Sequence, residues 1–239
     1  MSDSKYCPNC GAAVEAGTRF CQECGKDLNE YTQPAVEDKY TGTPRGAEKG
    51  AIDHITIGYT VALEQPMVFV PSIISGVLGF LVSYGLGYLG DTLSILIGLT
   101  VSMISFILNF ASIDMSRDAY YKQPLDLSNS ISYVVGRFVT FFIAAIFGGL
   151  LSITIVLIPV VLFMFVIMVL DETGIMDAFQ KSINVLKSDL VDVLVIIILG
   201  IVASLVIGFI PLISTLLDAI VNVILGIAFI DIYATYKSR

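Results

Sequence analysis

The four cysteines of the chain form two C-x-x-C pairs, Cys7 with Cys10 and Cys21 with Cys24, and a glycine follows each pair. A C-x-x-C turn brings two sulfur atoms to one side of a tight turn, and the glycine after it can adopt the positive φ that such turns need. Two of these turns complete a tetrahedral cage of four thiolates, which structural zinc sites prefer and which leaves no open position. The sequence therefore predicts a structural Zn²⁺ held by Cys7, Cys10, Cys21 and Cys24.

Two other chemistries of paired cysteines fit less well. Two disulfides would suit an exported domain, but the first residues lack the apolar segment and the small-residue cleavage site of a secretory signal. A redox centre needs one C-x-x-C pair and is typical of a βαβ context, which the sequence here does not indicate. Residues 5–28 resemble the short zinc ribbon found at the N-terminus of many prokaryotic proteins, and this resemblance specifies the metal rather than a role.

Charge decides against nucleic acid as a partner of the ribbon. The chain has 13 Lys and Arg against 21 Asp and Glu, a formal net charge of -8. Within the ribbon, acidic residues outnumber Lys5, Arg19 and Lys26. Because phosphate binding requires a basic face, we expect a structural or protein-interaction module with a protein partner instead.

Composition divides the chain into three parts and places the largest in a lipid bilayer. Hydrophobic residues make up 56% and charged residues 14% of the chain, whereas soluble domains have about 45–50% and about 25%. We expect a zinc ribbon at residues 1–28, a disordered linker rich in Pro, Gly, Thr and charge at residues 29–50, and an all-α transmembrane domain at residues 51–239.

The hydrophobic segments predict six transmembrane helices arranged as three hairpins. Residues 67–90, 92–113, 190–210 and 212–233 each suit one span of about 20 residues. Residues 138–170 exceed one span and are interrupted by Gly148-Gly149 and Pro159. We therefore expect two short helices there, at residues 136–152 and 155–170, that form a hairpin. One long tilted helix, which gives five spans, is the alternative.

Charge placement favours six spans with both termini in the cytoplasm. With that count, all 13 Lys and Arg lie on the inner side, where basic residues concentrate in membrane proteins, and the outer turns hold only Asp91 and Asp218. A five-span chain would place Lys181 and Lys187 outside. The sequence therefore predicts a multi-pass protein of the cell membrane.

Three segments that begin at Ile57, Leu127 and Phe179 align without gaps, and each carries a hydroxyl residue three positions on. A predicted hairpin follows each segment. The pattern indicates a unit made of an amphipathic interfacial helix and two spans, repeated three times.

Short motifs in the apolar region resemble a known family. Gly136-Arg137 before a span, Ile158-Pro159 within the next, and the segment DAFQKS at residues 177–182 resemble the membrane domain attached to some glycerophosphodiester phosphodiesterases, which stand-alone prokaryotic membrane proteins of unknown function share. The resemblance covers roughly residues 52–239. It implies a fold and a location but no activity, because the catalytic phosphodiesterase domain has no counterpart in these residues.

The sequence offers little for catalysis. His54 is the single histidine, we expect it to be an interfacial residue, and no H-E-x-x-H, G-x-S-x-G or P-loop motif is present. Asn109, Asn222 and Asp192 are polar residues within or beside spans. They predict hydrogen bonds between helices or, alternatively, a polar path through the bundle.

Together these features predict a non-enzymatic integral membrane protein with a cytoplasmic zinc-ribbon interaction module. The alternative is a transporter or channel subunit with a polar path through the helical bundle. The sequence specifies no oligomeric state.

Overall fold

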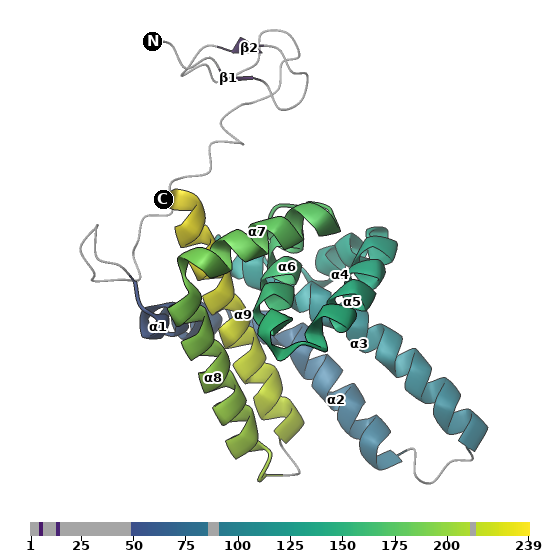
Figure 1. Cartoon of the computed structure of the whole chain (residues 1–239). Helices are drawn as coiled ribbons and strands as arrows, with labels where there is room; N and C mark the ends of the chain where they lie inside the picture. The colour runs from purple at the N-terminus through teal and green to yellow at the C-terminus, as the bar shows by residue number, and fades with distance from the viewer. Residues whose placement is uncertain (1–4, 7–12, 15–48, 86–90, 211–213) are drawn as a thin grey trace. The chain divides into compact units, whose positions relative to one another are not determined.

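The computed structural model describes residues 5–6, 13–14, 49–85, 91–210 and 214–239 (Figure 1). The chain divides into two compact units, Met1–Gly42 and Thr43–Arg239. In the first unit, β1 (Lys5–Tyr6) pairs with β2 (Ala13–Val14) in antiparallel register, with Lys5 opposite Val14. The described residues of the second unit are predominantly helical, so the expected all-helical class holds for the apolar part of the chain.

In the described residues of the second unit, a short helix precedes two further helices three times in succession. The first set is α1 (Ala51–Glu64), α2 (Val70–Gly85) and α3 (Asp91–Tyr120), with the 3-10 turn η2 (Pro66–Phe69) before α2. The second is α4 (Leu127–Gly136), α5 (Phe138–Ser152) and α6 (Ile158–Leu170), with η4 (Ile155–Leu157) before α6. The third is α7 (Ile175–Ser188), α8 (Leu190–Ile207) and α9 (Ser214–Ser238).

Among the described residues, four helices are long and apolar enough to cross a membrane: Pro66–Gly85, α3, α8 and α9. Helices α4 and α5 pass the same test only as a pair bent by 75°, which raises the number to five. The 15 residues of α5 extend about 22 Å, less than the roughly 30 Å of a hydrocarbon core. Figure 1 shows the turn between α5 and α6 well short of the far ends of α2, α3, α8 and α9. Six full-length spans are thus not found.

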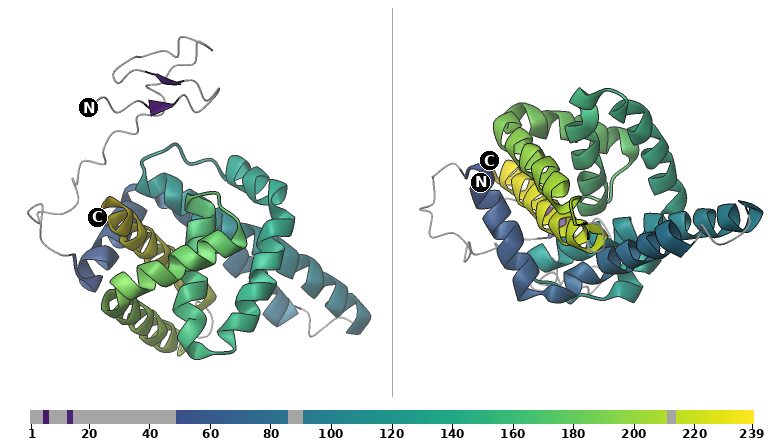
Figure 2. Two further views of the ribbon diagram at one scale, coloured as in Figure 1. Left: turned by 45° about the horizontal axis from the view of Figure 1, so that its top comes forward. Right: turned by 90° about the horizontal axis from the view of Figure 1, so that it is seen from below.

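The helices pack in a closed cycle around α3, α6 and α9, which contact one another. Each short helix packs against the last helix of the preceding set: α4 against α3, α7 against α6, and α1 against α9. Figure 2, in the view from below, shows α9 between α1 and α8, with the start of α3 extending away from them. The first helix of the unit is therefore joined directly to the last.

Burial is concentrated on α6 and on the central helices near the short helices. Phe163, Met164 and Ile167 of α6 are completely buried, whereas Leu205 on α8 and Leu99 on α3 are 65% and 61% exposed. Large apolar side chains exposed in such numbers suit contact with lipid rather than water. The described unit is therefore compatible with a multi-pass membrane protein.

Candidate functional site

A layer of ion pairs and hydrogen bonds connects the ends of α3, α6 and α9 with the short helices. Its centre consists of three aspartates that each follow an apolar residue: Asp114 in α3, Asp171 directly after α6, and Asp231 in α9. Asp114 and Asp231 are buried. Since a buried charge is costly unless it is paired, the partners of these carboxylates determine how the helices are held.

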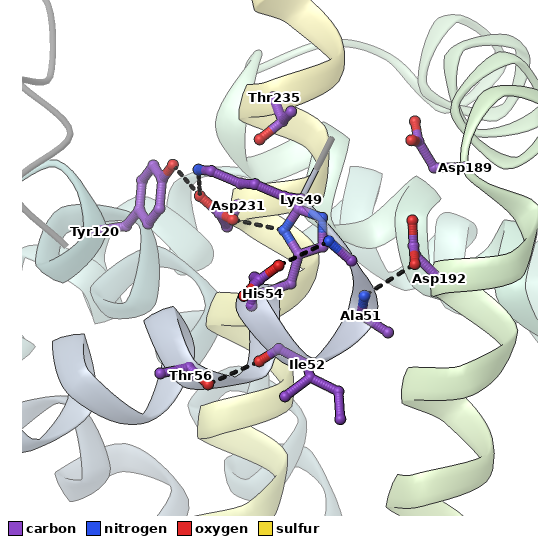
Figure 3. Close-up of polar contacts among 12 residues, drawn as sticks. Lys49, Ala51, Ile52, His54, Thr56, Tyr120, Asp189, Asp192, Asp231 and Thr235 are labelled. Carbon is purple, nitrogen blue, oxygen red and sulfur yellow. Dashed lines mark hydrogen bonds and ion pairs between the residues drawn. The ribbon is translucent and has the colours of Figure 1, made fainter. Parts of the chain in front are cut away.

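Asp231 has partners from three other segments of the chain (Figure 3). Its Oδ2 lies 2.6 Å from Nδ1 of His54 in α1. Its Oδ1 accepts a hydrogen bond of 2.6 Å from the hydroxyl of Tyr120 in α3 and lies 3.3 Å from Nζ of Lys49. His54 is only 2% exposed. The expectation of an interfacial histidine is therefore corrected: His54 lies on the inner face of α1, which α9 covers.

Two further contacts hold α1 in place. At its first turn, the backbone N–H of Ala51 donates a 2.9 Å hydrogen bond to Oδ1 of Asp192 at the start of α8 (Figure 3). A carboxylate there is favoured by the positive end of the helix dipole. In the middle of α1, a Cβ added to Gly58 would collide with the carbonyl oxygen of Ile224, so glycine permits a close backbone approach to α9. α1 is thus bound at its start by charge and along its length by packing.

Asp171 connects α6 with α7 and α9. Its Oδ2 accepts hydrogen bonds from Nζ of Lys181 at 2.8 Å and from the hydroxyl of Tyr233 at 2.6 Å, and its Oδ1 accepts one from Nζ of Lys237 at 3.0 Å. Burial by itself raises the pKa of the Asp171 carboxyl, but these three donors outweigh it and lower the pKa below the usual value. The hydrogen bond to Asp171 raises the pKa of Lys181 in turn. The group is thus an ionised junction between three helices.

Two arginines donate to backbone carbonyls at the end of α6, among them that of Met168, and in the turn that follows it. Arg117 donates to the carbonyl of Val169 at 3.2 Å and forms an ion pair with Asp114 at 2.8 Å. Arg137 donates to the carbonyls of Glu172 and Thr173 at 3.1 and 2.9 Å. The last carbonyls of a helix lack partners within it and carry partial negative charge. Gly136 and Arg137 thus lie at the bend between α4 and α5, and Arg137 also binds backbone carbonyls at the end of α6.

The polar residues expected to line a path are not brought together. Asp192 is the cap of α1. Asn222 on α9 lines an apolar groove between helices, and Asn109 on α3 is exposed and absent from that lining. Each carboxylate of the polar layer has a cationic or hydrogen-bonding partner. Within the described residues, no group of three or more His, Cys, Asp or Glu side chains could hold a metal ion. The layer therefore joins helices of the described part of the chain.

Cys7, Cys10, Cys21 and Cys24 lie outside the described residues; only the strand residues near the first pair, β1 and β2, are described. Comparison with known families finds a zinc-ribbon domain at residues 6–28, a stretch that contains all four cysteines. The zinc-ribbon domain expected from the sequence is thus found, and this family implies structural zinc. The assignment of the four ligands remains a prediction.

Two other comparisons with known proteins find no match. No curated protein matches this sequence, and no solved structure matches this fold. The resemblance of residues 52–239 to the membrane domain of glycerophosphodiester phosphodiesterases finds no support in these comparisons. Sequence reasoning missed the polar layer: it indicated Asp192 as a polar residue beside a span, but not Asp114, Asp171 or Asp231.

Proposed function

We propose that this chain is a multi-pass protein of the cell membrane, without catalytic activity of its own, that holds a zinc ribbon in the cytoplasm as an interaction module for another protein. The observation that carries the proposal is the attachment of α1. This helix follows the ribbon and linker in sequence and is joined to α9 through the buried pair of His54 and Asp231. A ribbon tethered to so firmly held a helix remains at the membrane surface.

The position of the basic residues supports the cytoplasmic orientation. Cationic residues at the ends of the central helices and along α7 gather toward one end of the bundle: Arg117, Arg137, Lys181, Lys237 and Arg239. Lys and Arg concentrate on the cytoplasmic side of membrane proteins. We infer that this end faces the cytoplasm and that both termini of the chain lie there.

The count of six spans requires α5 and α6 to cross the bilayer with 15 and 13 residues. We propose instead that they enter from the cytoplasmic side and return to it, because helices of this length extend only about 20–22 Å, less than the roughly 30 Å of a hydrocarbon core. Either arrangement brings the chain back to the same side, so the placement of both termini does not depend on which is correct.

An interaction experiment tests this function. The full-length protein would be purified from its native membrane in detergent, as wild type, as Cys21→Ser and as Asn9→Ala, which alters the first cysteine turn without removing a ligand. We expect about one zinc per wild-type chain and near-complete loss in Cys21→Ser, because a structural site needs all four ligands. Metal analysis by mass spectrometry provides this measurement.

The same preparations show whether the ribbon recruits a protein. A co-purifying protein that is retained by wild type and Asn9→Ala but lost from Cys21→Ser supports the proposal, provided that the helical unit melts at the same temperature in all three. Identical sets of co-purifying proteins in the zinc-containing and zinc-free forms would contradict an interaction role for the ribbon.

A further inference from the structure

An apolar groove of about 650 Å³ opens between α3, α6, α8 and α9. Ile158 and Leu162, at the start of α6, form one wall, and Ile201 and Leu205 of α8 form another. Ser204 and Asn222 are the polar residues in its lining. The groove exists because α6 begins at Ile158, short of the far ends of its neighbours, and so leaves space between α3, α8 and α9 beyond the turn that joins it to α5 (Figure 1).

Two polar residues of α9 bear on this groove: Asn222 belongs to its lining, and Asp218 lies one helical turn from Asn222, outside the lining. Asn222 is exposed and makes no hydrogen bond to the described residues, and Asp218 has a fully buried Oδ1 that likewise lacks a hydrogen-bond partner there. Residues four apart share a face of a helix, so both belong to one side of α9. A buried oxygen without a donor is costly. The exposed Asn222 amide and the outer oxygen of the half-buried Asp218 carboxyl therefore offer acceptors to a ligand that supplies donors.

The surroundings of the groove indicate what fills it. Exposed apolar side chains continue from its wall across the outer surface of α8 and onto η4, among them Ile198 at 57%, Val202 at 50% and Ile155 at 81%. Gly226, one helical turn from Asn222, leaves the groove wide, since a Cβ there would meet nothing within 4 Å. An apolar groove that is continuous with a lipid-facing surface suits a hydrocarbon chain as its occupant.

We propose that this groove binds one acyl chain of a bilayer lipid, from the leaflet opposite the polar layer, whose headgroup donates hydrogen bonds to Asn222 and Asp218. This inference rests on the membrane placement proposed above. The Asp218 carboxyl, as an acceptor, selects against a headgroup that has no N–H or O–H donor, such as phosphocholine, and in favour of an ammonium such as that of phosphatidylethanolamine.

The test is native mass spectrometry of the full-length protein in detergent, with either phosphatidylethanolamine or phosphatidylcholine of identical acyl chains added. Wild type should retain one phosphatidylethanolamine per chain and clearly less phosphatidylcholine. Gly226→Leu fills the groove and should weaken retention about tenfold. Gly79→Leu is the matched control, because a Cβ at this α2 position also meets nothing within 4 Å but Gly79 is not part of this groove's lining, and the variant should bind as wild type does.

Two further variants separate the headgroup from the chain. Asn222→Leu and Asp218→Asn should each reduce the preference for phosphatidylethanolamine about threefold or more, as expected for loss of a hydrogen bond to a charged group. Retention of the two lipids in equal amounts by wild type would overturn the proposal. So would an equal loss of lipid in Gly226→Leu and Gly79→Leu, or a dimer without lipid that Gly226→Leu dissociates.

Failure of this inference can be told from failure of the proposed function. A wild-type protein that fractionates with membranes and melts cooperatively but retains no lipid overturns the groove site alone. A protein that remains monodisperse in buffer without detergent overturns the membrane placement itself.

Discussion

At the scale of single residues, Asp231 is the most deeply buried of the three central carboxylates of the polar layer. It accepts from Tyr120 and contacts His54 and Lys49, while it is only 1% exposed. A buried charge that loses its partner is among the few single changes that cost several kcal/mol. Asp231 should therefore be the residue of this layer that tolerates substitution least.

We expect Asp231→Asn to lower the free energy of unfolding by about 3 kcal/mol, because the Lys49 ammonium loses its counter-charge and His54 loses its carboxylate partner. Denaturant unfolding in detergent, followed by circular dichroism, measures the change. Asp91→Asn at the exposed start of α3 serves as the control and should cost less than about 1 kcal/mol. Equal effects of the two substitutions would show that the buried layer does not stabilise the fold.

Asp171 should make the free energy of unfolding depend on pH in the acid range. Its pKa in the folded protein lies below the usual 3.8, so the folded state binds its proton less readily than the unfolded state does. The stabilisation is fully present above about pH 4 and is lost as the pH falls through the folded pKa. In a series of melting curves at decreasing pH, Asp171→Asn should flatten the acid limb that wild type shows. An acid limb of unchanged steepness in the variant would assign it to other carboxylates.

Some of this chemistry could be predicted from sequence and some could not. The C-x-x-C pairs indicated a zinc ribbon because ligand type and spacing are local properties, and a zinc-ribbon domain is found at residues 6–28. The contact between His54 and Asp231 joins residues 177 positions apart. Nothing in the sequence near His54 indicates which helix covers that face of α1, so the sequence could not predict this pair.

At the scale of helices, the position of α1 depends on how closely its backbone approaches α9. Gly58 faces the carbonyl oxygen of Ile224, and an added Cβ would also lie 3.2 Å from the backbone nitrogen of Ala228. Backbone atoms cannot move aside as a flexible side chain can. A methyl group at this position therefore forces the two helices apart.

Gly58→Ala should destabilise the packing of α1 by about 1–3 kcal/mol, the usual cost of overpacking, despite the higher helix propensity of alanine. Hydrogen exchange of the α1 amides should accelerate correspondingly. Gly79→Ala adds the same methyl group where nothing lies within 4 Å and should leave this exchange unchanged. Equally slow exchange of the α1 amides in both variants would show that the packing of α1 on α9 tolerates the added methyl group.

Helices α5 and α6 show that hydropathy locates a helix better than it predicts whether the helix contacts lipid or protein. Residues 136–152 and 155–170 were expected as two short helices, and α5 and α6 begin and end close to these bounds because Gly and Pro act locally. Their failure to extend as far as the other helices was not expected. Most of α6 is buried in protein, with Phe163 and Ile167 fully covered, so its apolar composition reflects a protein core rather than lipid contact.

At the scale of the whole molecule, the cyclic packing and the charge distribution support the membrane orientation proposed above. The ends of α3 and α9 that carry Arg117 and Lys237 face one side, and the start of α3 at Asp91 faces the other. This orientation can be measured without knowledge of the partner.

A single cysteine introduced as Asp91→Cys should react with a membrane-impermeant thiol reagent applied to intact cells. Lys187→Cys, at an exposed position of α7, should react only after the membrane is made permeable. Mass spectrometry of labelled peptides distinguishes these sites from the native cysteines of the ribbon. Labelling of Lys187→Cys in intact cells would reverse the orientation.

The contact of α1 with α9 also has a consequence for biosynthesis. A ribosome produces α1 long before it produces α9, and the two helices are neighbours only in the finished unit. Until the last helix has been inserted, the histidine on α1 has no carboxylate to meet and the cycle of helices stays open. Nascent chains halted before α9 should therefore expose α1 to proteases, and maturation should end with a single late closure that secures the start of the helical unit.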